Sequence, residues 1–122
     1  MTASVLIVEH DPNMAQSIGF LMRRSGFTVR RAGDAETAIA AVRAQPPDLV
    51  LTATTLPGHD GHDLCRALRT ERACAATRVV FVSARARAVD REKALALGAD
   101  AYVTKPFASR DLVSRVRDLL EG

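Results

Sequence analysis

The sequence predicts an α/β fold in which helices cover both faces of a parallel sheet. Short apolar runs alternate five times with segments of helical period, and the links between them are short. Residues typical of helix caps and turns, such as Asp, Gly and Pro, mark the boundaries. Alternation of this kind is typical of βα units that build a parallel sheet. The 122 residues, 48% of them hydrophobic, are enough for one core, so we expect residues 1–122 to form a single domain.

Each predicted element has a local signal. Unbroken or nearly unbroken apolar runs predict five strands, at residues 4–8, 27–32, 48–53, 78–83 and 100–104. The second of these ends in two arginines and is therefore expected at an edge of the sheet. Asp11-Pro12 opens the first helix and Gly26 closes it, while Asp34 caps the second helix and Pro46-Pro47 stops it. Further helices are expected around 64–68, over 89–97 and over 112–120.

Composition excludes several classes of protein. The net charge is +3, but the 15 arginines are scattered and aromatic residues make up only 4%, so we expect no nucleic-acid binding. No apolar run approaches the roughly 18–20 residues that cross a bilayer, and no signal peptide is evident, which favours a cytoplasmic protein without membrane contact. Cys65 and Cys74 lie nine positions apart on or near one predicted helix, hence on opposite faces. They are interpreted as reduced structural residues, with a redox pair as the alternative.

Four segments at the predicted carboxyl ends of the strands carry a family resemblance. They are 5–12, with Glu9-His10-Asp11-Pro12; 47–61, ending Leu56-Pro57-Gly58-His59-Asp60-Gly61; Ser83-Ala84; and 98–107, with Lys105-Pro106-Phe107. In this order and spacing they resemble the receiver domains of response regulators in two-component phosphorelay signalling. The resemblance covers essentially the whole chain. It implies a flavodoxin-like, doubly wound (βα)5 three-layer sandwich with strand order 2-1-3-4-5.

The resemblance also implies a phosphoryl-transfer site, from which this chain departs. The family's phosphoacceptor aspartate is matched by Ala53, whose methyl group cannot attack phosphorus. The family's acidic pair, which binds Mg²⁺, is matched by Glu9 and His10, so that Mg²⁺ binding should be weak or absent. Asp11 lies one place beyond this pair and is expected to cap the helix.

Other pocket positions match the family. Lys105 and Ser83 match the residues that contact the phosphoryl oxygens, and Thr55 matches the residue whose carbonyl faces the metal. Lys105 is expected to pair with Glu9 and Ser83 to cap the next turn, or both to retain some anion binding. With the nucleophile missing, we expect no catalytic residue, no cofactor and no enzymatic activity.

Two alternatives stay open. The first is a phosphorylatable regulator with another acceptor; Thr52 and Thr54 flank Ala53, but neighbouring strand positions should point them away from its side. The second is a metal-sensing or pH-sensing module that uses His10, His59 and His62, because imidazole suits transition metals and titrates near neutral pH. Against it stands the plainer interpretation that all three are surface-loop histidines.

The favoured function is a receiver-type signalling module, or pseudo-receiver, that acts independently of phosphorylation through protein–protein contact. Its partners would be a histidine kinase, an effector domain or a second copy in a homodimer. The resemblance assigns these contacts to the face formed by helix four, strand five and helix five. Tyr102 would be the switch residue of that face, which is expected to comprise Val89, Arg91, Lys93, Ala94, Tyr102, Arg110 and Val113.

Overall fold

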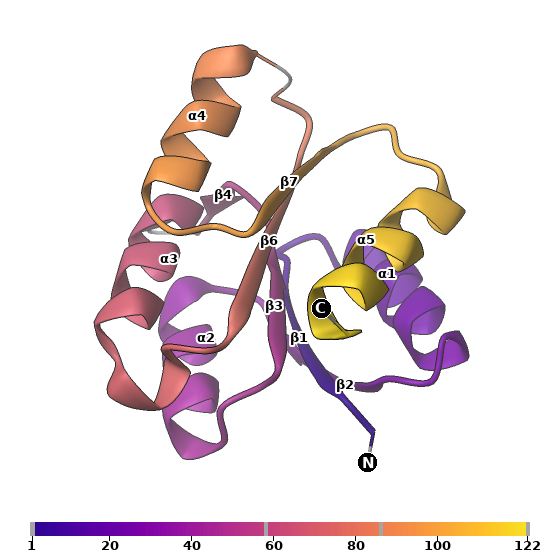
Figure 1. The fold of residues 1–122 in the computed structure, drawn as a ribbon, viewed down its shortest axis with the longest axis horizontal. Helices are drawn as coiled ribbons and strands as arrows, with labels where there is room; N and C mark the ends of the chain where they lie inside the picture. The colour runs from indigo at the N-terminus through magenta and orange to yellow at the C-terminus, as the bar shows by residue number, and fades with distance from the viewer. Residues whose placement is uncertain (1, 58, 86, 122) are drawn as a thin grey trace.

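Five parallel strands form the centre of the computed structural model, which describes residues 2–57, 59–85 and 87–121 (Figure 1). The side chains at 59, 60 and 73 are also outside this description. The sheet strands are β1 (Ser4–Val8), β2 (Thr28–Ala32), β3 (Leu49–Thr52), β6 (Arg78–Ser83) and β7 (Ala101–Thr104). Their order across the sheet is β2-β1-β3-β6-β7. Counted among the sheet strands alone this is 2-1-3-4-5, so the predicted order and the edge position of β2 are confirmed.

Helices cover both faces of the sheet. On one face lie α1 (Pro12–Arg24) and α5 (Ser109–Glu121); on the other lie α2 (Ala35–Ala44), α3 (Gly61–Thr70) and α4 (Ala88–Ala96) (Figure 1). The predicted three-layer, flavodoxin-like sandwich is therefore confirmed. None of the helices among the described residues is long and apolar enough to span a membrane.

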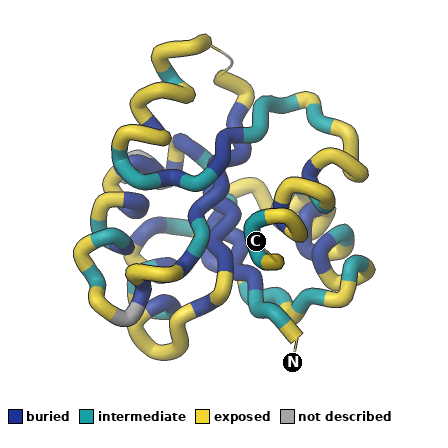
Figure 2. The backbone as a smooth tube through the Cα atoms, viewed as in Figure 1, coloured by how far each residue is buried: buried dark blue, intermediate teal, exposed yellow. Residues whose placement is uncertain are grey.

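Two hydrophobic cores, one on each face of the sheet, hold the layers together. Successive strand residues point to opposite faces, so β1 supplies Leu6 and Val8 to the core beneath α2, α3 and α4 and supplies Val5 and Ile7 to the core beneath α1 and α5. All four are at most 1% exposed. Figure 2 shows the resulting band of buried backbone through the middle of the molecule.

Helix caps act as predicted. The carboxylate of Asp11 accepts a hydrogen bond of 2.9 Å from the amide N–H of Asn13, and Asp34 accepts one of 2.7 Å from the amide N–H of Thr37. Each bond satisfies an amide that has no partner within the first helical turn. The prediction that Asp11 serves as a helix cap is confirmed, because its carboxylate binds the amide of Asn13 in the first turn of α1.

Two local features were not predicted. A short antiparallel hairpin, β4 (Thr55–Leu56) with β5 (His59–Asp60), lies between β3 and α3, and a 3₁₀ turn, η1 (Arg72–Cys74), follows α3. The turn corrects the placement of the cysteines, because α3 ends at Thr70 and the two thiols do not share a helix. Cys65 and Cys74 are both free and are buried in the same core. The predicted opposite faces are therefore wrong.

Candidate functional site

A pocket of about 220 Å³ opens at the carboxyl ends of β1, β3 and β6, beside the end of β7. Parallel strands bring their carboxyl ends to one edge, which is why residues far apart in the chain meet there. The pocket is lined by Glu9, Ala53, Thr54, Thr55, Val82, Ser83, Ala84, Arg85 and Lys105. Five of the residues singled out from the sequence are therefore brought together: Glu9, Ala53, Thr55, Ser83 and Lys105.

Among the described side chains, one acidic group lines the pocket, and both of its oxygens already have partners within the protein. The ammonium nitrogen of Lys105 lies 3.6 Å from Oε1 of Glu9, as expected from the sequence. Oε2 of the same carboxylate accepts a hydrogen bond of 3.1 Å from the amide N–H of Asp11. Both oxygens of Glu9 thus have a partner within the protein.

Two buried hydroxyl groups face each other in the pocket. Oγ1 of Thr54 and Oγ of Ser83 are 2.8 Å apart, and both residues are buried. The amide N–H of Arg85 also donates a 3.0 Å hydrogen bond to Oγ of Ser83, so this hydroxyl caps the following turn as predicted. These contacts hold the loops after β3 and β6 together at the floor of the site.

The position of Thr54 differs from the one predicted. We expected neither Thr52 nor Thr54 to share the direction of Ala53, since strand residues alternate. Thr52 is absent from the pocket lining, but Thr54 lines it with Ala53. The physical reason is that β3 ends at Thr52, so the alternation of a strand no longer applies two residues later.

Arg85 lines the pocket but was not predicted to do so. Its guanidinium lies at the pocket, where Nη2 donates a hydrogen bond of 3.4 Å to Oγ1 of Thr55. Its position two residues after Ser83, in a loop that leaves the carboxyl end of a strand, was the available signal. The described lining of the pocket therefore contains two cationic side chains, Arg85 and Lys105, and one carboxylate, Glu9.

Neither His10 nor His62 is among the residues that line the pocket. His10 is exposed, and Asp11 does not line the pocket either. His62 is only 5% exposed and packs against Phe81, with ring centroids 5.2 Å apart, so the surface-loop interpretation is wrong for it. The side chain of His59 lies outside the described residues. Within the described part of the chain, no group of three or more His, Cys, Asp or Glu side chains is placed to hold a metal ion.

The family described as response regulator receiver domain matches residues 5–117. The chain belongs to this family. The pocket at the carboxyl ends of the strands therefore corresponds to the region in which the sequence resembled a receiver domain, and the resemblance is confirmed at the level of the family.

Named relatives agree with this assignment. The receiver domain is 41% identical over 117 residues to the sensory transduction protein RegX3 of Mycolicibacterium smegmatis, covering 96% of this chain and 50% of RegX3. It is 40% identical to the DNA-binding response regulator MtrA of the same organism, with the same coverage. The chain thus spans about half the length of these relatives. A crystal structure of a putative response regulator from Chloroflexus aurantiacus superposes with a TM-score of 0.95 at 29% identity, covering 100% of both chains.

In this receiver domain Tyr102 points inward from β7. It is 3% exposed, its hydroxyl donates a 2.8 Å hydrogen bond to the carbonyl oxygen of Arg85, and the guanidinium of Arg91 lies 5.6 Å from its ring centroid. Ala94 is also buried, in the core beneath α4. Neither residue forms part of the exposed face assigned to them from the sequence, since both side chains fill the space between α4 and the sheet.

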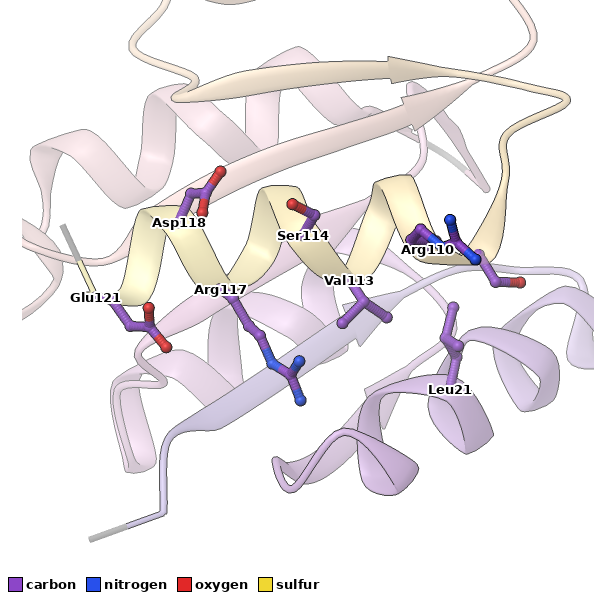
Figure 3. Close-up of a pocket in the computed structure, with 8 residues that line it drawn as sticks. Leu21, Arg110, Val113, Ser114, Arg117, Asp118 and Glu121 are labelled. Atoms are coloured by element: carbon purple, nitrogen blue, oxygen red, sulfur yellow. The ribbon is translucent and has the colours of Figure 1, made fainter.

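A second depression lies on the side of the molecule that α1 and α5 cover. It is a groove of about 380 Å³ between α1 and α5, in which Leu21 and Val113 face each other (Figure 3). The charged residues along it, Arg110, Arg117, Asp118 and Glu121, include both signs and come from α5 alone. These charged side chains follow one helix, whereas the residues of the pocket at the strand ends come from several loops. We therefore assign the functional site to the pocket at the carboxyl ends of the strands.

Proposed function

We propose that this receiver domain acts without phosphorylation at the usual position, as a pseudo-receiver that works by protein–protein contact. The observation that carries the proposal is Ala53, which lines the pocket together with Lys105 and Ser83. A phosphoryl acceptor needs a nucleophilic lone pair, and a methyl group has none. The residues that would contact a phosphoryl group are retained, but the atom that would carry it is missing.

The charged side chains that line the pocket support weak or absent binding of Mg²⁺. Magnesium ions bind hard oxygen ligands and usually take one or two carboxylates from a protein. Glu9 is the one carboxylate among the lining residues that the structure describes, and its two oxygens already contact Lys105 and the amide of Asp11. Two cationic groups beside it would further disfavour a divalent cation. We therefore infer that the domain uses no cofactor and performs no catalysis.

We infer that the partners are proteins: a histidine kinase, an effector domain or a second copy of the domain. The supporting surface is that of α4, β7 and α5, where Val89 is 56% exposed and Arg91, Lys93 and Arg110 are also exposed. The same helices also expose Glu92 and Asp111. An exposed apolar side chain among charges of both signs suits a partner with an apolar contact and complementary charges around it. The scattered arginines give no support for nucleic-acid binding by this domain.

Phosphorylation with a small donor tests the proposal. The wild-type domain, incubated with acetyl phosphate and Mg²⁺ and weighed intact under denaturing conditions, should gain no phosphoryl mass. The double variant Ala53→Asp, His10→Asp restores a nucleophile and a metal-binding carboxylate and should gain one phosphoryl group. Ala53→Asn with His10→Asp is the matched control, since it keeps the shape but lacks the nucleophile. Phosphoryl transfer to the wild type would overturn the proposal.

A second candidate, phosphorylation on another residue, is favoured by one observation: the hydroxyl of Thr54 lines the same pocket as Ala53. Peptide mapping of any phosphorylated wild-type protein would identify the acceptor, and Thr54→Val should then abolish the modification. The described histidines give no comparable support to a metal-sensing function, because His62 is buried against Phe81 and His10 does not line the pocket.

A further inference from the structure

A groove between α1 and the start of α5 offers an apolar surface outside the pocket at the strand ends. Its volume is about 380 Å³, and five of the residues that line it are apolar: Met14, Ile18, Phe20, Leu21 and Phe107. It adjoins the depression of Figure 3, because Leu21 lines both. Cavities of about 300–1,000 Å³ with mostly apolar walls are typical of small-molecule sites. We call this one the Phe20 groove.

The sequence of α1 explains why the Phe20 groove is apolar. Met14, Ile18 and Leu21 follow one another at spacings of four and three positions, so their side chains lie along one stripe of the helix. Ile18 is 3% exposed, whereas Phe20 is 63% exposed. A single exposed aromatic ring is common on protein surfaces. Phe20, however, lines the groove with four other apolar side chains, so a ligand there removes the apolar surface of several residues from water.

The polar residues that line the Phe20 groove carry one positive charge and no negative charge. They are Arg24, Ser17 and Ser109. Arg24 is exposed, and no carboxylate within the described part of the chain forms an ion pair with it. It follows Phe20 by four positions, so its guanidinium belongs to the next turn of the helix. A guanidinium beside an apolar wall complements a ligand that joins an apolar body to an anionic group.

The adjoining depression does not change this balance of charge. Its charged residues are two arginines and two acids: Arg110, Arg117, Asp118 and Glu121. Their formal charges cancel, so Arg24 sets the sign of the charge at the Phe20 groove.

We propose that the Phe20 groove binds a small amphipathic anion, which has an apolar chain or ring and one carboxylate. The apolar body lies against Phe20, Leu21 and Phe107, and the carboxylate accepts hydrogen bonds from the guanidinium of Arg24. A cavity of about 150 Å³ holds a benzene ring, so the groove has room for a body of roughly eight carbon atoms. The groove shares no lining residue with the pocket at the strand ends, so the inference is independent of the proposed function.

Titration of the purified receiver domain with octanoate tests the proposal, with amide chemical shifts as the readout and the ionic strength held constant. We expect saturable shifts that are largest at Ser17, Phe20 and Ser109. Shorter carboxylates should bind at least about twofold more weakly for each methylene removed, because each buried methylene contributes to the free energy of transfer from water. Octylamine has the same chain with a positive charge and should cause no saturable shifts at the groove.

Two pairs of variants separate the charge from the apolar wall. Arg24→Ala should weaken octanoate binding about threefold to tenfold, the range from an exposed ion pair to a hydrogen bond with a charged group. Arg23→Ala is its matched control, since Arg23 is exposed but does not line the groove. Ser17→Trp fills the groove and should abolish binding, whereas Gln16→Trp, at an exposed position outside the lining, should not. All four positions are exposed, so folding is expected to persist, and circular dichroism checks it.

Three results would overturn the inference: no saturable shifts with octanoate in the wild type, equal binding of octylamine and octanoate, or undiminished octanoate binding by Ser17→Trp. If octanoate does not bind, sedimentation of the wild type and of Phe20→Ala shows whether a second copy of the domain covers the exposed ring instead. None of these outcomes bears on phosphoryl transfer, which the mass after incubation with acetyl phosphate reports separately.

Discussion

The phenol of Tyr102 donates a hydrogen bond of 2.8 Å to the carbonyl oxygen of Arg85, while the amide of Arg85 donates one of 3.0 Å to the hydroxyl of Ser83. The backbone of Arg85 thus links β7 to the floor of the pocket. The ring of Tyr102 is held in place by Phe81, at a centroid distance of 6.2 Å, and by Arg91. The pocket and the face of α4 and β7 are therefore joined by contacts that need no phosphoryl group.

Tyr102→Phe should lower the free energy of unfolding by about 1 kcal/mol, since it removes the donor and leaves the carbonyl of Arg85 without its partner. The ring itself is kept, so the contacts with Phe81 and Arg91 persist. Urea unfolding followed by circular dichroism measures the effect. An unchanged midpoint at unchanged slope would mean that water replaces the phenol without cost.

Asp100→Asn should lower the free energy of unfolding by about 1–3 kcal/mol. The carboxylate of Asp100 is partly buried, lies 3.0 Å from Arg69 and 3.4 Å from Arg78, and accepts a 2.8 Å hydrogen bond from the amide of Val79. Removing the charge weakens all three interactions and takes away the anion that the two arginines share.

The control for Asp100→Asn is Asp63→Asn. The ion pair of Asp63 with Arg66 is 3.5 Å long, and both side chains are more than half exposed. Solvent screens such pairs, so the loss should stay below about 0.5 kcal/mol. Equal losses in the two variants, measured by denaturant unfolding, would contradict the assignment of a structural role to Asp100.

Gly61→Ala should destabilise the fold by about 1–3 kcal/mol, because the added methyl group would overlap the carbonyl oxygen of Ala53 and crowd the ring of Phe81. This glycine lets the start of α3 approach the strand end that shapes the pocket. Gly33→Ala is the matched control, since nothing lies within 4 Å of its added methyl group, and it should be neutral or slightly stabilising. The midpoints of thermal unfolding of both variants test this prediction. A midpoint for Gly61→Ala equal to that of the wild type would be inconsistent with this packing.

The stability of the domain should fall as pH rises above about 8.5, the ordinary range for a thiol. Burial raises the pKa of Cys65, outweighing the opposite effect of the nearby Arg69 cation, and burial together with Glu71 raises the pKa of Cys74. The folded state therefore keeps its thiol protons where the unfolded chain loses them. Since the unfolded state then binds fewer protons, the contribution to stability is complete below the unfolded pKa and is lost as pH rises through the folded pKa.

Cys65→Ala tests this pH dependence. The variant should be less stable at neutral pH because of the lost packing, but its free energy of unfolding should decline less steeply between about pH 8 and pH 10. Urea titrations across that range provide the measurement. Parallel declines in wild type and variant would show that Cys65 does not contribute.

The fold could be predicted from the sequence because its signals are local. Apolar runs such as 4–8 and 78–83 identify buried strands, and cap residues such as Asp11 and Asp34 mark helix starts within three residues of the amides they bind. The hairpin β4–β5 and the turn η1 were not predicted, because such short elements have no periodicity to detect. The same limitation misplaced Cys74, whose burial depends on a turn of three residues.

At the site, the order of residues alone specifies the alanine at position 53, the pair Glu9 and His10, and the retained Ser83 and Lys105. These are facts of chemical identity and need no coordinates. The hydrogen bond between Thr54 and Ser83 spans 29 positions, and the contact of Arg85 with Thr55 spans 30. Where a side chain points after its strand has ended depends on packing between distant loops, so the positive character of the pocket became visible only in three dimensions.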